Sequence, residues 1–588
     1  MTKEEFICNV EKLKTMLNEN RFSESANLCE ALIDNIELIV GIADEEAVRR
    51  NLAQMNAVIV IETGCHERVK EAEALLKEHG NDGYSSFLLA RLMWLAEDNF
   101  NALATLEKCY SISVSGNDLL IAPDSLFWTL DKDTQQRVLN LLGHAYKFFS
   151  IPMMAAKCSF LGKEIVEDLP TKWQEYSNYL FDLHYLPMTA EDYFQAHVGF
   201  NDLFRGLGQL KHSKKLHRRH KKIRIGYISS DFRQHVCLLF IWAMLTKYDR
   251  QRFEVYVFSR SSVEDDYSNC IKKSVNGWFN ISQVFYPQAA KLIFEQEIDI
   301  LVDLAGHASG NGLPILAYKP APVQVCGIGY FATTGLKAVD YFLTDRYLIN
   351  EDTQKYFVEK LLVMPHSHFC YTPLNDMPHA SKGAPCRRNG YVTFGSFNNL
   401  TKVNDDVLFV WSEVLKRVPQ SRLLLKGSML SNPEGKELMR QKLLSLGLSE
   451  DRFELQPFTL PYLEQYHEVD IALDTFPYPG GGTTCDALYM GVPVVTLGDG
   501  SHGGNFGVSL LKNIGLDECC TYSKQDYIEK AVLLASDYEL LDVLHIGLRN
   551  MMDKSPVLDG VSYMRDLENC YQKIWHKYLK GNSLCRRC

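Results

Sequence analysis

The chain has 588 residues, of which 46% are hydrophobic and 11% aromatic, a composition that argues against disorder and allows several buried cores. At about 150 residues per domain, this length predicts roughly four domains. The 62 Lys and Arg residues are outnumbered by 73 Asp and Glu residues, which gives a net charge of −11 and excludes a protein-wide basic surface for nucleic acid. An anionic ligand must therefore bind at a local site.

Cysteine usage and hydropathy predict a reduced, soluble, cytoplasmic protein. The 16 cysteines are scattered, and the C-x-x-C motif of Cys585 and Cys588 has no second ligand pair at zinc-binding spacing, so we assign it to a terminal tail. The charged, amphipathic N-terminus does not have the pattern of a signal peptide. The longest apolar run, 236–245, is much shorter than the ~20 residues that span a bilayer.

Residues 1–207 have helical periodicity and predict a domain of paired helices. Gly143 and Ala155 are small enough to let two antiparallel helices approach closely, Tyr146 fills the groove between them, and Pro152 is suited to the start of the second helix. This pattern resembles a tetratricopeptide helix pair. Weaker copies run through Leu89–Ala90 to Ala102 and Leu106, and around Leu17 and Ala26.

The helical repeat is irregular. Ala90 and Gly143 are 53 residues apart, whereas tetratricopeptide units repeat at about 34 residues. An insertion around 115–132 is therefore required, and we predict a degenerate repeat domain, with an ordinary helical bundle as the alternative.

A basic stretch, KHSKKLHRRHKK, occupies residues 211–222. Such a stretch could be a nuclear-localisation or nucleic-acid patch. Because it separates two differently patterned regions of an acidic protein, we interpret 208–222 as a solvated interdomain linker.

From residue 223 on, short apolar runs alternate with helix-length segments, which is typical of parallel sheets covered by helices. The expected strands lie at 223–228, 253–258, 298–304, 391–397, 423–426, 453–455, 471–473 and 494–497. We predict two α/β Rossmann-like lobes, 223–375 and 391–560, joined by a hinge at 376–390 and followed by a helix at 561–580 and the tail 581–588.

Ligands of doubly wound domains bind beyond the carboxyl ends of the strands, which directs attention to the loop DTFPYPGGGTTCDAL, 474–488. Its glycines allow the backbone to approach a ligand, and Thr483 and Thr484 stand where a helix begins and can bind an anion. Asp486 is suitably placed for ribose hydroxyls. The loop matches neither a Walker A motif nor G-x-G-x-x-G, and a glycine run is often only a turn.

Further candidates follow other strands. Lys402 stands at a helix entry and could neutralise a diphosphate leaving group. His235, Asp303 and His307 lie at strand exits of the first lobe. A lone lysine or histidine is more often structural, but several such residues at strand ends on both sides of a cleft favour catalysis.

Six segments resemble a single family: the O-GlcNAc transferase and SPINDLY group of protein glycosyltransferases, family 41. The segments, which occur in the family's order, are RIGYISSDFRQH (224–235), ILVDLAGHASGN (300–311), KPAPVQVCGIGYFATTGL (319–336), YVTFGSFNNLTKVNDDVLFVW (391–411), DIALDTFPYPGGGTTCDALYMGVPVVTL (470–497) and GVSLLKNIGL (507–516). The resemblance covers roughly residues 222–580.

The resemblance implies a GT-B fold of two Rossmann-like lobes behind helical repeats that present a protein or peptide acceptor. It implies inverting transfer of a sugar from a nucleotide sugar to Ser or Thr hydroxyls, without a metal or other cofactor. UDP-GlcNAc is the expected donor. The alternatives are GDP-fucose as donor, transfer to asparagine or of another hexose, and an inactive interaction scaffold.

The resemblance also implies roles for individual residues. Lys402 and Thr483 correspond to contacts of the donor diphosphate, Asp486 to the acid that holds the donor ribose, and His235 to a histidine near the reacting hydroxyl. Asp303 is a weaker catalytic candidate. The remaining donor-pocket positions are Asn399, Gly481, Gly482, Thr484, Tyr330 and Thr333.

Three departures from the family pattern concern the donor pocket. Phe331 replaces the proline of a Gly-Tyr-Pro loop beside the sugar. Gly481 and Gly482 stand where many relatives carry His or Thr, so backbone N–H groups must replace side-chain contacts. The segment after Thr496 lacks an arginine found in many bacterial relatives.

Overall fold

The computed structural model describes residues 1–40, 44–116, 118–217, 219–374 and 377–580. The chain divides into two units, the first comprising 1–168 with 432–437, and the second 169–431 with 438–588. The Cys585–Cys588 motif, the predicted tail and the start of the predicted hinge lie outside the described residues. Within the described ranges, no helix is long and apolar enough to cross a membrane.

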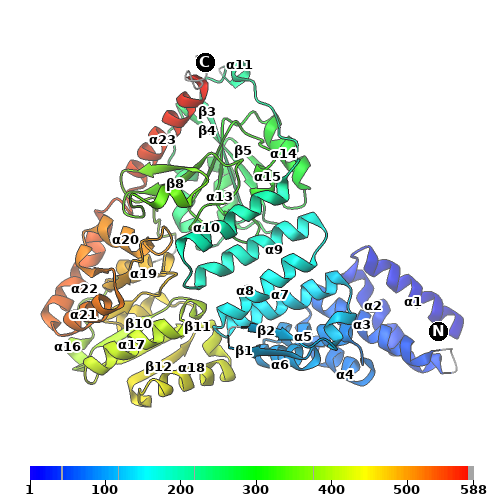
Figure 1. The fold of residues 1–588 in the computed structure, drawn as a ribbon. Coiled ribbons are helices and arrows are strands. Elements are labelled where there is room, and N and C mark those ends of the chain that lie inside the picture. The colour runs from blue at the N-terminus through cyan, green and yellow to red at the C-terminus, as the bar shows by residue number, and fades with distance from the viewer. Residues whose placement is uncertain (41–43, 117, 218, 375–376, 581–588) are drawn as a thin grey trace. The chain divides into compact units, whose positions relative to one another are not determined.

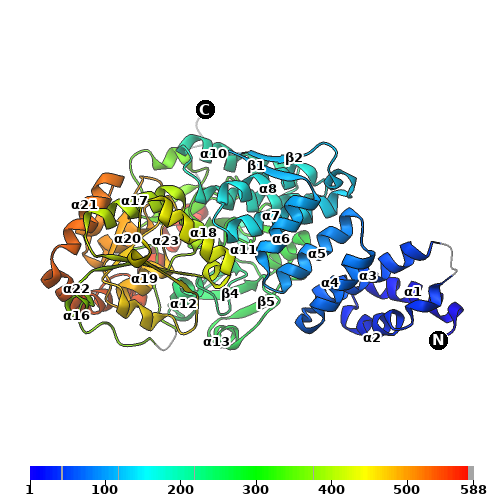
Figure 2. The same cartoon turned by 90° about the horizontal axis from the view of Figure 1, so that it is seen from below.

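The first unit is built from consecutive helices that pack against one another (Figure 2). They are α1 (Lys3–Asn18), α2 (Phe22–Ile33), α3 (Glu45–Thr63), α4 (Val69–His79), α5 (Gly83–Leu95), α6 (Asn99–Cys109), α7 (Lys132–Phe148) and α8 (Pro152–Ile165). The predicted pairs are confirmed as α1–α2, α5–α6 and α7–α8. Pro152 opens α8, and a Cβ added to Gly143 would lie 3.5 Å from the Cβ of Cys158, which shows how closely α7 and α8 approach.

The predicted insertion at 115–132 contains strands that the sequence did not indicate. β1 (Ile112–Ser115) and β2 (Asp118–Ile121) form an antiparallel pair, and the short 3-10 helix η3 (Leu126–Thr129) follows. Each strand has four residues and is mostly exposed, so neither produces the buried apolar run on which strand prediction depends.

The helices that follow Asp168 belong to the second unit, although the sequence groups them with the helical domain 1–207. They are α9 (Leu169–Asp182), η4 (Leu183–Tyr185), α10 (Ala190–Val198) and η5 (Gly199–Phe204). Buried hydrogen bonds fix them to the first lobe: Ser177 Oγ to His307 Nδ1 at 2.9 Å and His197 Nε2 to Tyr330 Oη at 2.6 Å. This difference arises because helical periodicity alone does not reveal the packing partner.

The basic stretch 211–222 is packed on the first lobe, which differs from the solvated linker expected. Leu210 N donates to Tyr318 O at 2.9 Å, and His212 Nε2 lies 2.8 Å from Lys319 O. His217, at the end of α11 (Lys214–His217), is only 5% exposed. The histidines among the basic residues, rather than the lysines, make these buried contacts.

The first lobe is a parallel sheet with strand order β5-β4-β3-β6-β7-β8-β9. Its strands are β3 (Ile223–Ser229), β4 (Phe253–Ser259), β5 (Gly277–Asn280), β6 (Ile300–Asp303), β7 (Val323–Cys326), β8 (Tyr341–Asp345) and β9 (Lys360–Met364). Its helices are α12 (Leu238–Thr246), α13 (Asp266–Ser274), α14 (Tyr286–Glu295) and α15 (Leu313–Leu316). Three expected strands are confirmed, while β5, β7, β8 and β9 were not expected.

The second lobe repeats this topology with strand order β12-β11-β10-β13-β14-β15, again parallel. Its strands are β10 (Thr393–Ser396), β11 (Arg422–Gly427), β12 (Phe453–Pro457), β13 (Ile471–Leu473), β14 (Val494–Leu497) and β15 (Cys520–Thr521). Its helices are α16 (Cys386–Asn389), α17 (Asp405–Arg417), α18 (Pro433–Ser445), α19 (Gly482–Tyr489), α20 (Phe506–Ile514), α21 (Lys524–Ala535) and α22 (Tyr538–Asp553). The predicted fold class, helices followed by two Rossmann-like lobes, is confirmed (Figure 1).

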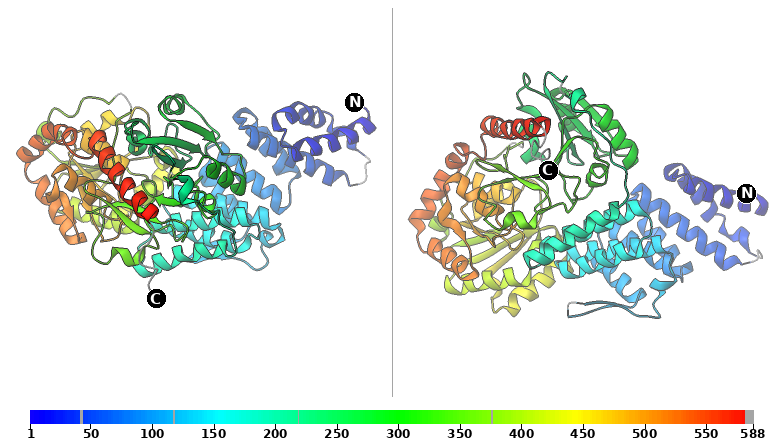
Figure 3. Two further views of the ribbon diagram at one scale, coloured as in Figure 1. Left: turned by 90° about the horizontal axis from the view of Figure 1, so that it is seen from above. Right: turned by 45° about the horizontal axis from the view of Figure 1, so that its top comes forward.

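The last helix, α23 (Gly560–Lys580), returns from the second lobe to the first, as Figures 1 and 3 show. It packs against α12, β7 and β9. The buried Glu568 carboxylate accepts from Asp249 N at 2.6 Å and from Arg252 Nη2 at 2.8 Å. The segment 365–390 connects the first lobe to the second along the chain. Because α23 follows the second lobe and packs on the first, it forms a second connection between them.

If α23 is a structural link, shortening a buried side chain on it must destabilise the second unit. Leu567 is 0% exposed, and we expect Leu567→Ala to lower the free energy of unfolding by roughly 2–5 kcal/mol because it leaves a cavity. On the same helix Val561 is 68% exposed, so Val561→Ala should stay within about 0.5 kcal/mol of wild type. Urea denaturation measures both, and equal effects would contradict this role of α23.

Candidate active site

A buried carboxylate organises the loop that follows β13. Asp474 Oδ1 accepts hydrogen bonds from Gly480 N at 2.7 Å and Thr475 N at 2.9 Å, and Oδ2 accepts from Thr496 Oγ1 at 2.8 Å. Asp474 is 1% exposed, and its burial raises the pKa of the carboxyl group. The loop therefore folds back onto the strand end that precedes it, which holds the glycines in place.

The start of α19 provides a binding surface for an anion. Among the described residues no side chain caps this helix, whose N-cap is Gly481. Unpaired N–H groups at a helix start attract negative charge. Thr483 Oγ1 donates to Asn398 Oδ1 at 2.6 Å. A small recess adjoins this point, lined by residues that include Gly395, Ser396, Phe397, Asn398, Tyr466, Asp474, Thr483 and Thr484.

Lys402 approaches the same loop from the end of the short 3-10 helix η7 (Leu400–Lys402). Its Nζ donates to Pro479 O at 2.9 Å and lies 3.8 Å from the centre of the Tyr478 ring. Burial lowers the pKa of Lys402 to about 8, against the opposing effect of the Asp474 charge. The Lys402 ammonium group thus contacts one carbonyl oxygen and one aromatic ring. A diphosphate could take their place and form stronger, charge-assisted hydrogen bonds with Nζ.

Asp486, the predicted ribose contact, lies one turn further along α19. Tyr371 Oη donates to its Oδ1 at 2.7 Å and Tyr462 Oη donates to Oδ2 at 2.6 Å. The residue is 5% exposed, and burial raises the pKa of its carboxyl group. Two tyrosines that the sequence did not single out therefore fix the position of this carboxylate.

His235 follows β3 in the first lobe, and its side chain is 36% exposed. Cys237 N donates to its Nδ1 at 3.2 Å, so a neutral ring carries its proton on Nε2. Asp231 Oδ1 lies 3.5 Å from the same Nδ1. In this tautomer Nε2–H is a hydrogen-bond donor.

The His235 segment and the glycine loop meet at one point, although they belong to different lobes. A Cβ added to Gly482 would lie only 2.6 Å from Val236 Cγ2, whereas one added to Gly481 would meet nothing within 4 Å. The absence of a side chain at Gly482 therefore allows the lobes to approach. The structure therefore places the segment of His235 and Lys402 beside the same glycine loop, as predicted.

Asp303, the weaker catalytic candidate, is not exposed to a ligand. It is 0% exposed, and its carboxylate accepts from Gly306 N at 2.6 Å and Gly312 N at 3.3 Å. Burial raises the pKa of Asp303 to about 6. Its predicted catalytic role is corrected to a positioning role, because its oxygens hold the following loop.

His307 and Tyr330 are also internal. His307 Nε2 lies 2.9 Å from Thr334 O, and burial lowers its pKa well below the ordinary value, which keeps the ring neutral. Tyr330 is 0% exposed, and its hydroxyl is engaged by His197. Tyr330 is therefore packed in the interior, and its predicted place at the edge over the sugar stays a prediction.

Thr333 and Asn399, two further residues predicted to contact the donor, form hydrogen bonds within the protein instead. Thr333 Oγ1 donates to the buried Glu359 Oε2 at 2.6 Å and does not face outward. Asn399 is exposed and accepts from Thr401 N at 3.1 Å, which starts η7. Its neighbour Asn398, which sequence reasoning missed, reaches Thr483 instead. A polar residue directly after a buried strand was the available signal for Asn398.

Phe331, the departure from the family's proline, joins an aromatic cluster next to Lys402. Its ring centre lies 4.9 Å from that of Tyr478 and 5.0 Å from that of His184 in η4. Phe181, at the end of α9, lies 6.3 Å away. The helices before the first lobe thus contribute side chains to the surroundings of Lys402, which the sequence did not predict.

One group of side chains in this region has the composition of a metal site. Asp231, His235 and Cys237 place one ligand atom each within 4.8 Å of the others. Burial and the neighbouring Asp231 raise the pKa of the Cys237 thiol well above its usual value. The thiol is therefore protonated at neutral pH, which disfavours metal binding through this sulfur.

Comparison with known proteins agrees with this geometry. The model of glycosyl transferase family 41 matches residues 206–387 and 386–567. A probable UDP-N-acetylglucosamine–peptide N-acetylglucosaminyltransferase SPINDLY of Petunia hybrida is 38% identical over 421 residues, which are 69% of this chain and 44% of that protein. The Arabidopsis thaliana protein of the same description is 41% identical over 374 residues, 61% of this chain and 40% of that protein.

The chain thus spans less than half the length of these curated relatives. Among solved structures, a mutant of the O-GlcNAc transferase of Thermobaculum terrenum superposes with a TM-score of 0.76 and 24% identity. The match covers 92% of this chain and 99% of that one, and it supports the fold.

The environment of Lys402 predicts an unusual titration. Its ammonium group should lose its proton near pH 8, whereas exposed lysines do so at about pH 10.4. Reductive methylation with ¹³C-formaldehyde followed by NMR across pH 6–11 measures this, with Lys402→Arg identifying the signal. A Lys402 signal that titrates together with the exposed lysines would contradict the burial of its ammonium group.

Proposed function

Because the chain belongs to glycosyltransferase family 41, we propose that it is a protein glycosyltransferase that transfers a sugar from a nucleotide sugar to a peptide hydroxyl. UDP-GlcNAc is the donor we expect. The observation that carries the proposal is the meeting of Lys402 with the uncapped start of α19 at one glycine loop. That combination provides positive charge and N–H donors for a diphosphate in an otherwise acidic protein.

The donor diphosphate is the leaving group of the proposed reaction. As the acceptor oxygen bonds to the anomeric carbon, the bond from that carbon to the diphosphate oxygen breaks and its electron pair leaves with the phosphate. Lys402 Nζ, the N–H groups of α19 and Thr483 Oγ1 would stabilise the charge that develops. Attack from the face opposite the leaving group inverts the anomeric centre, and no metal ion is needed to balance the charge.

On the acceptor side we assign His235 to orienting the hydroxyl group. Since Cys237 N–H donates to Nδ1, the free Nε2–H can donate to the acceptor oxygen or to an adjacent donor oxygen. The acceptor proton would then pass to a phosphate oxygen of the departing diphosphate or to water. The sequence placed His235 near the reacting hydroxyl and left open whether it accepts the proton or orients the acceptor.

The peptide acceptor is the second part of the proposal. The helices of the first unit supply the repeated surface on which an extended peptide can bind, and Ser or Thr hydroxyls are the expected acceptor groups. Transfer to asparagine, use of GDP-fucose and an inactive scaffold are the competing hypotheses, and a donor and acceptor screen distinguishes them.

Removing the Lys402 ammonium group should abolish transfer while leaving the protein folded. We expect Lys402→Ala to lower the rate of sugar transfer to peptide by roughly 100-fold or more, the cost of losing one preorganised contact to developing charge. Lys416→Ala, an exposed lysine paired with Glu413 in the same lobe, is the matched control.

The assay should use UDP-GlcNAc, UDP-glucose and GDP-fucose with EDTA present, with the product anomer read by NMR. Undiminished transfer by Lys402→Ala would remove the proposed diphosphate role. Transfer only from GDP-fucose would make GDP-fucose the donor. Transfer that requires added Mg²⁺ or Mn²⁺ would contradict the metal-free mechanism, and no thermal shift with any donor would favour the scaffold.

The role of His235 predicts a difference between two variants. His235→Ala removes the donor and should cost on the order of 100-fold in transfer, whereas His235→Gln retains an N–H donor and should lose clearly less. If His235 acts as a base, neither variant can accept the proton, and both should lose roughly 100- to 10,000-fold. Equal losses would therefore reject the orienting role.

A further inference from the structure

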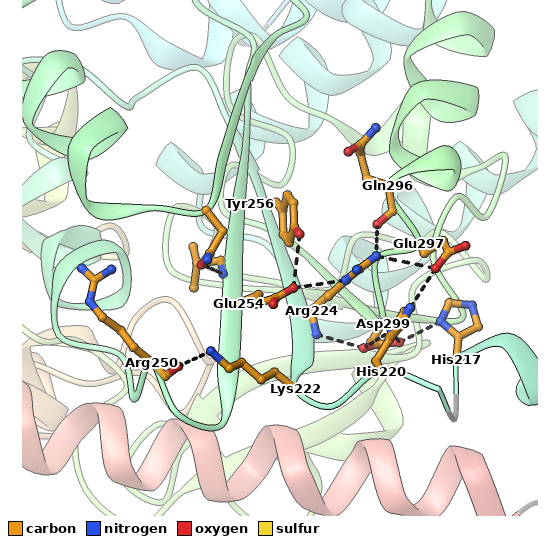
Figure 4. Close-up of polar contacts among 12 residues, drawn as sticks. His217, His220, Lys222, Arg224, Arg250, Glu254, Tyr256, Gln296, Glu297 and Asp299 are labelled. Carbon is orange, nitrogen blue, oxygen red and sulfur yellow. Dashed lines mark hydrogen bonds and ion pairs between the residues drawn. The ribbon is translucent and has the colours of Figure 1, made fainter.

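Two histidines and two carboxylates gather at the amino ends of β3 and β6, away from the proposed active site (Figure 4). Asp299, directly before β6, is 0% exposed, and His217 is 5% exposed. His217 Nδ1 lies 2.7 Å from Asp299 Oδ1, and His220 Nδ1 lies 3.0 Å from Asp299 Oδ2. His220 Nε2 lies 2.9 Å from Glu297 Oε2.

A neutral His220 ring cannot donate hydrogen bonds to both of the carboxylates that it contacts. Both of its nitrogens face a carboxylate oxygen at 2.9–3.0 Å, but a neutral imidazole carries only one N–H. One contact therefore requires additional positive charge, either a second ring proton or a cation between Nδ1 and Asp299. Because His217 Nδ1 faces the same carboxylate, the additional charge would have three converging ligand atoms.

We propose that His217 Nδ1, His220 Nδ1 and the Asp299 carboxylate bind a divalent transition-metal ion of the Zn²⁺ class. Glu297 would accept the remaining His220 Nε2–H. A carboxylate that holds the second nitrogen of a ligating histidine is the usual support of such sites, because it fixes the tautomer in which Nδ1 is free to bind the metal.

The geometry agrees with a tetrahedral ion. Bonds of about 2.0–2.2 Å to nitrogen and oxygen place neighbouring ligand atoms roughly 3.3 Å apart. The three ligand atoms lie within 4.8 Å of one another, and the shortest separation, 2.7 Å between His217 Nδ1 and Asp299 Oδ1, would have to widen when the ion binds. With three protein ligands, water would complete the coordination.

The surrounding charges determine where the ion can bind. Arg224 N donates to Asp299 Oδ2 at 2.9 Å, and its guanidinium group lies 3.2 Å from Glu254 and 3.6 Å from Glu297. The guanidinium therefore neutralises the two outer glutamates, while Asp299 receives only neutral N–H groups from Arg224. Asp299 keeps a charge available for an ion.

The site would stabilise the fold rather than take part in sugar transfer. His217 and His220 belong to the basic stretch 211–222, while Asp299 starts a central strand whose far end, Asp303, holds a loop of the first lobe. Asp303 comes four residues after Asp299, which is about 13 Å along the strand at 3.3 Å per residue. An ion at the near end would fix the basic stretch to the sheet without reaching the donor.

The test is metal uptake by the full-length protein after removal of metal with a chelator. We expect wild type to bind one equivalent of Zn²⁺ in competition with a chromophoric chelator, and Co²⁺ to give visible d–d absorption without a thiolate charge-transfer band, which separates this site from Cys585 and Cys588. His217→Ala removes a ligand and should lower the Zn²⁺ affinity at least about 10-fold. Glu297→Gln leaves the three ligands in place but weakens the acceptor of His220 Nε2–H, and should lower the affinity by roughly 10- to 100-fold.

His212→Ala is the matched control, since His212 lies in the same stretch but its Nε2 is engaged by Lys319 O at 2.8 Å. Zn²⁺ should also raise the melting temperature of wild type and of His212→Ala, and not that of His217→Ala. Absence of uptake by wild type would overturn the proposal and leave a doubly protonated His220 as the source of the charge. Equal uptake by His217→Ala and His212→Ala would overturn it as well.

Discussion

The Asp474 carboxylate is the constraint on which the proposed donor site depends. It stands at the carboxyl end of β13 and holds two backbone N–H groups of its own loop together with the Thr496 hydroxyl of β14. Its backbone oxygen also accepts from Tyr527 Oη at 2.9 Å. With the loop fixed in this way, the start of α19 borders the recess and Lys402 reaches Pro479. An anion therefore meets donors that are already oriented, which reduces the reorganisation that binding requires.

Side-chain contacts also fix the two lobes against each other. Ser509 Oγ in α20 donates to Asp345 Oδ2 at 2.7 Å, and His502 Nε2 lies 3.0 Å from Thr344 Oγ1. His502 Nδ1 lies 3.0 Å from the carbonyl oxygen of Phe331. Together with α23, these buried contacts explain how residues from both lobes can form one site. At the boundary between the lobes there is no room for a side chain at position 482, because Val236 occupies the space that its Cβ would need.

Much of the fold could be predicted from the sequence, because strands buried on both faces are apolar throughout. Every expected strand has a counterpart, from 223–228 (β3) to 494–497 (β14). The hairpin β1–β2 was missed because its strands are short and exposed, and the docking of 211–222 was missed because charge dominates its composition. The end of the helical unit was placed at 207 rather than 168 because α9 and α10 are periodic in the same way as the helices before them.

The site residues, too, fall into those that the sequence could indicate and those that it could not. Lys402, Thr483 and His235 could be proposed because each follows a strand end, where ligands bind in such folds. Asn398, Tyr371 and Tyr462 could not, because their importance lies in hydrogen bonds to residues distant in sequence. Tyr330 and Thr333 were placed at the ligand by resemblance and Asp303 by its position at a strand exit. All three are buried, so neither a motif position nor a strand end determines which way a side chain points.

The most direct test of the account compares UDP with UMP, and GDP with GMP, by calorimetric binding in the presence of EDTA. In the proposed site, Lys402 and the start of α19 supply the contacts that give the second phosphate its share of the affinity. Wild type should therefore bind the diphosphate of at least one pair more tightly than the monophosphate. Lys402→Ala should narrow that gap by about 10-fold or more, the value of one charge-assisted hydrogen bond. An unchanged gap in Lys402→Ala would contradict the account.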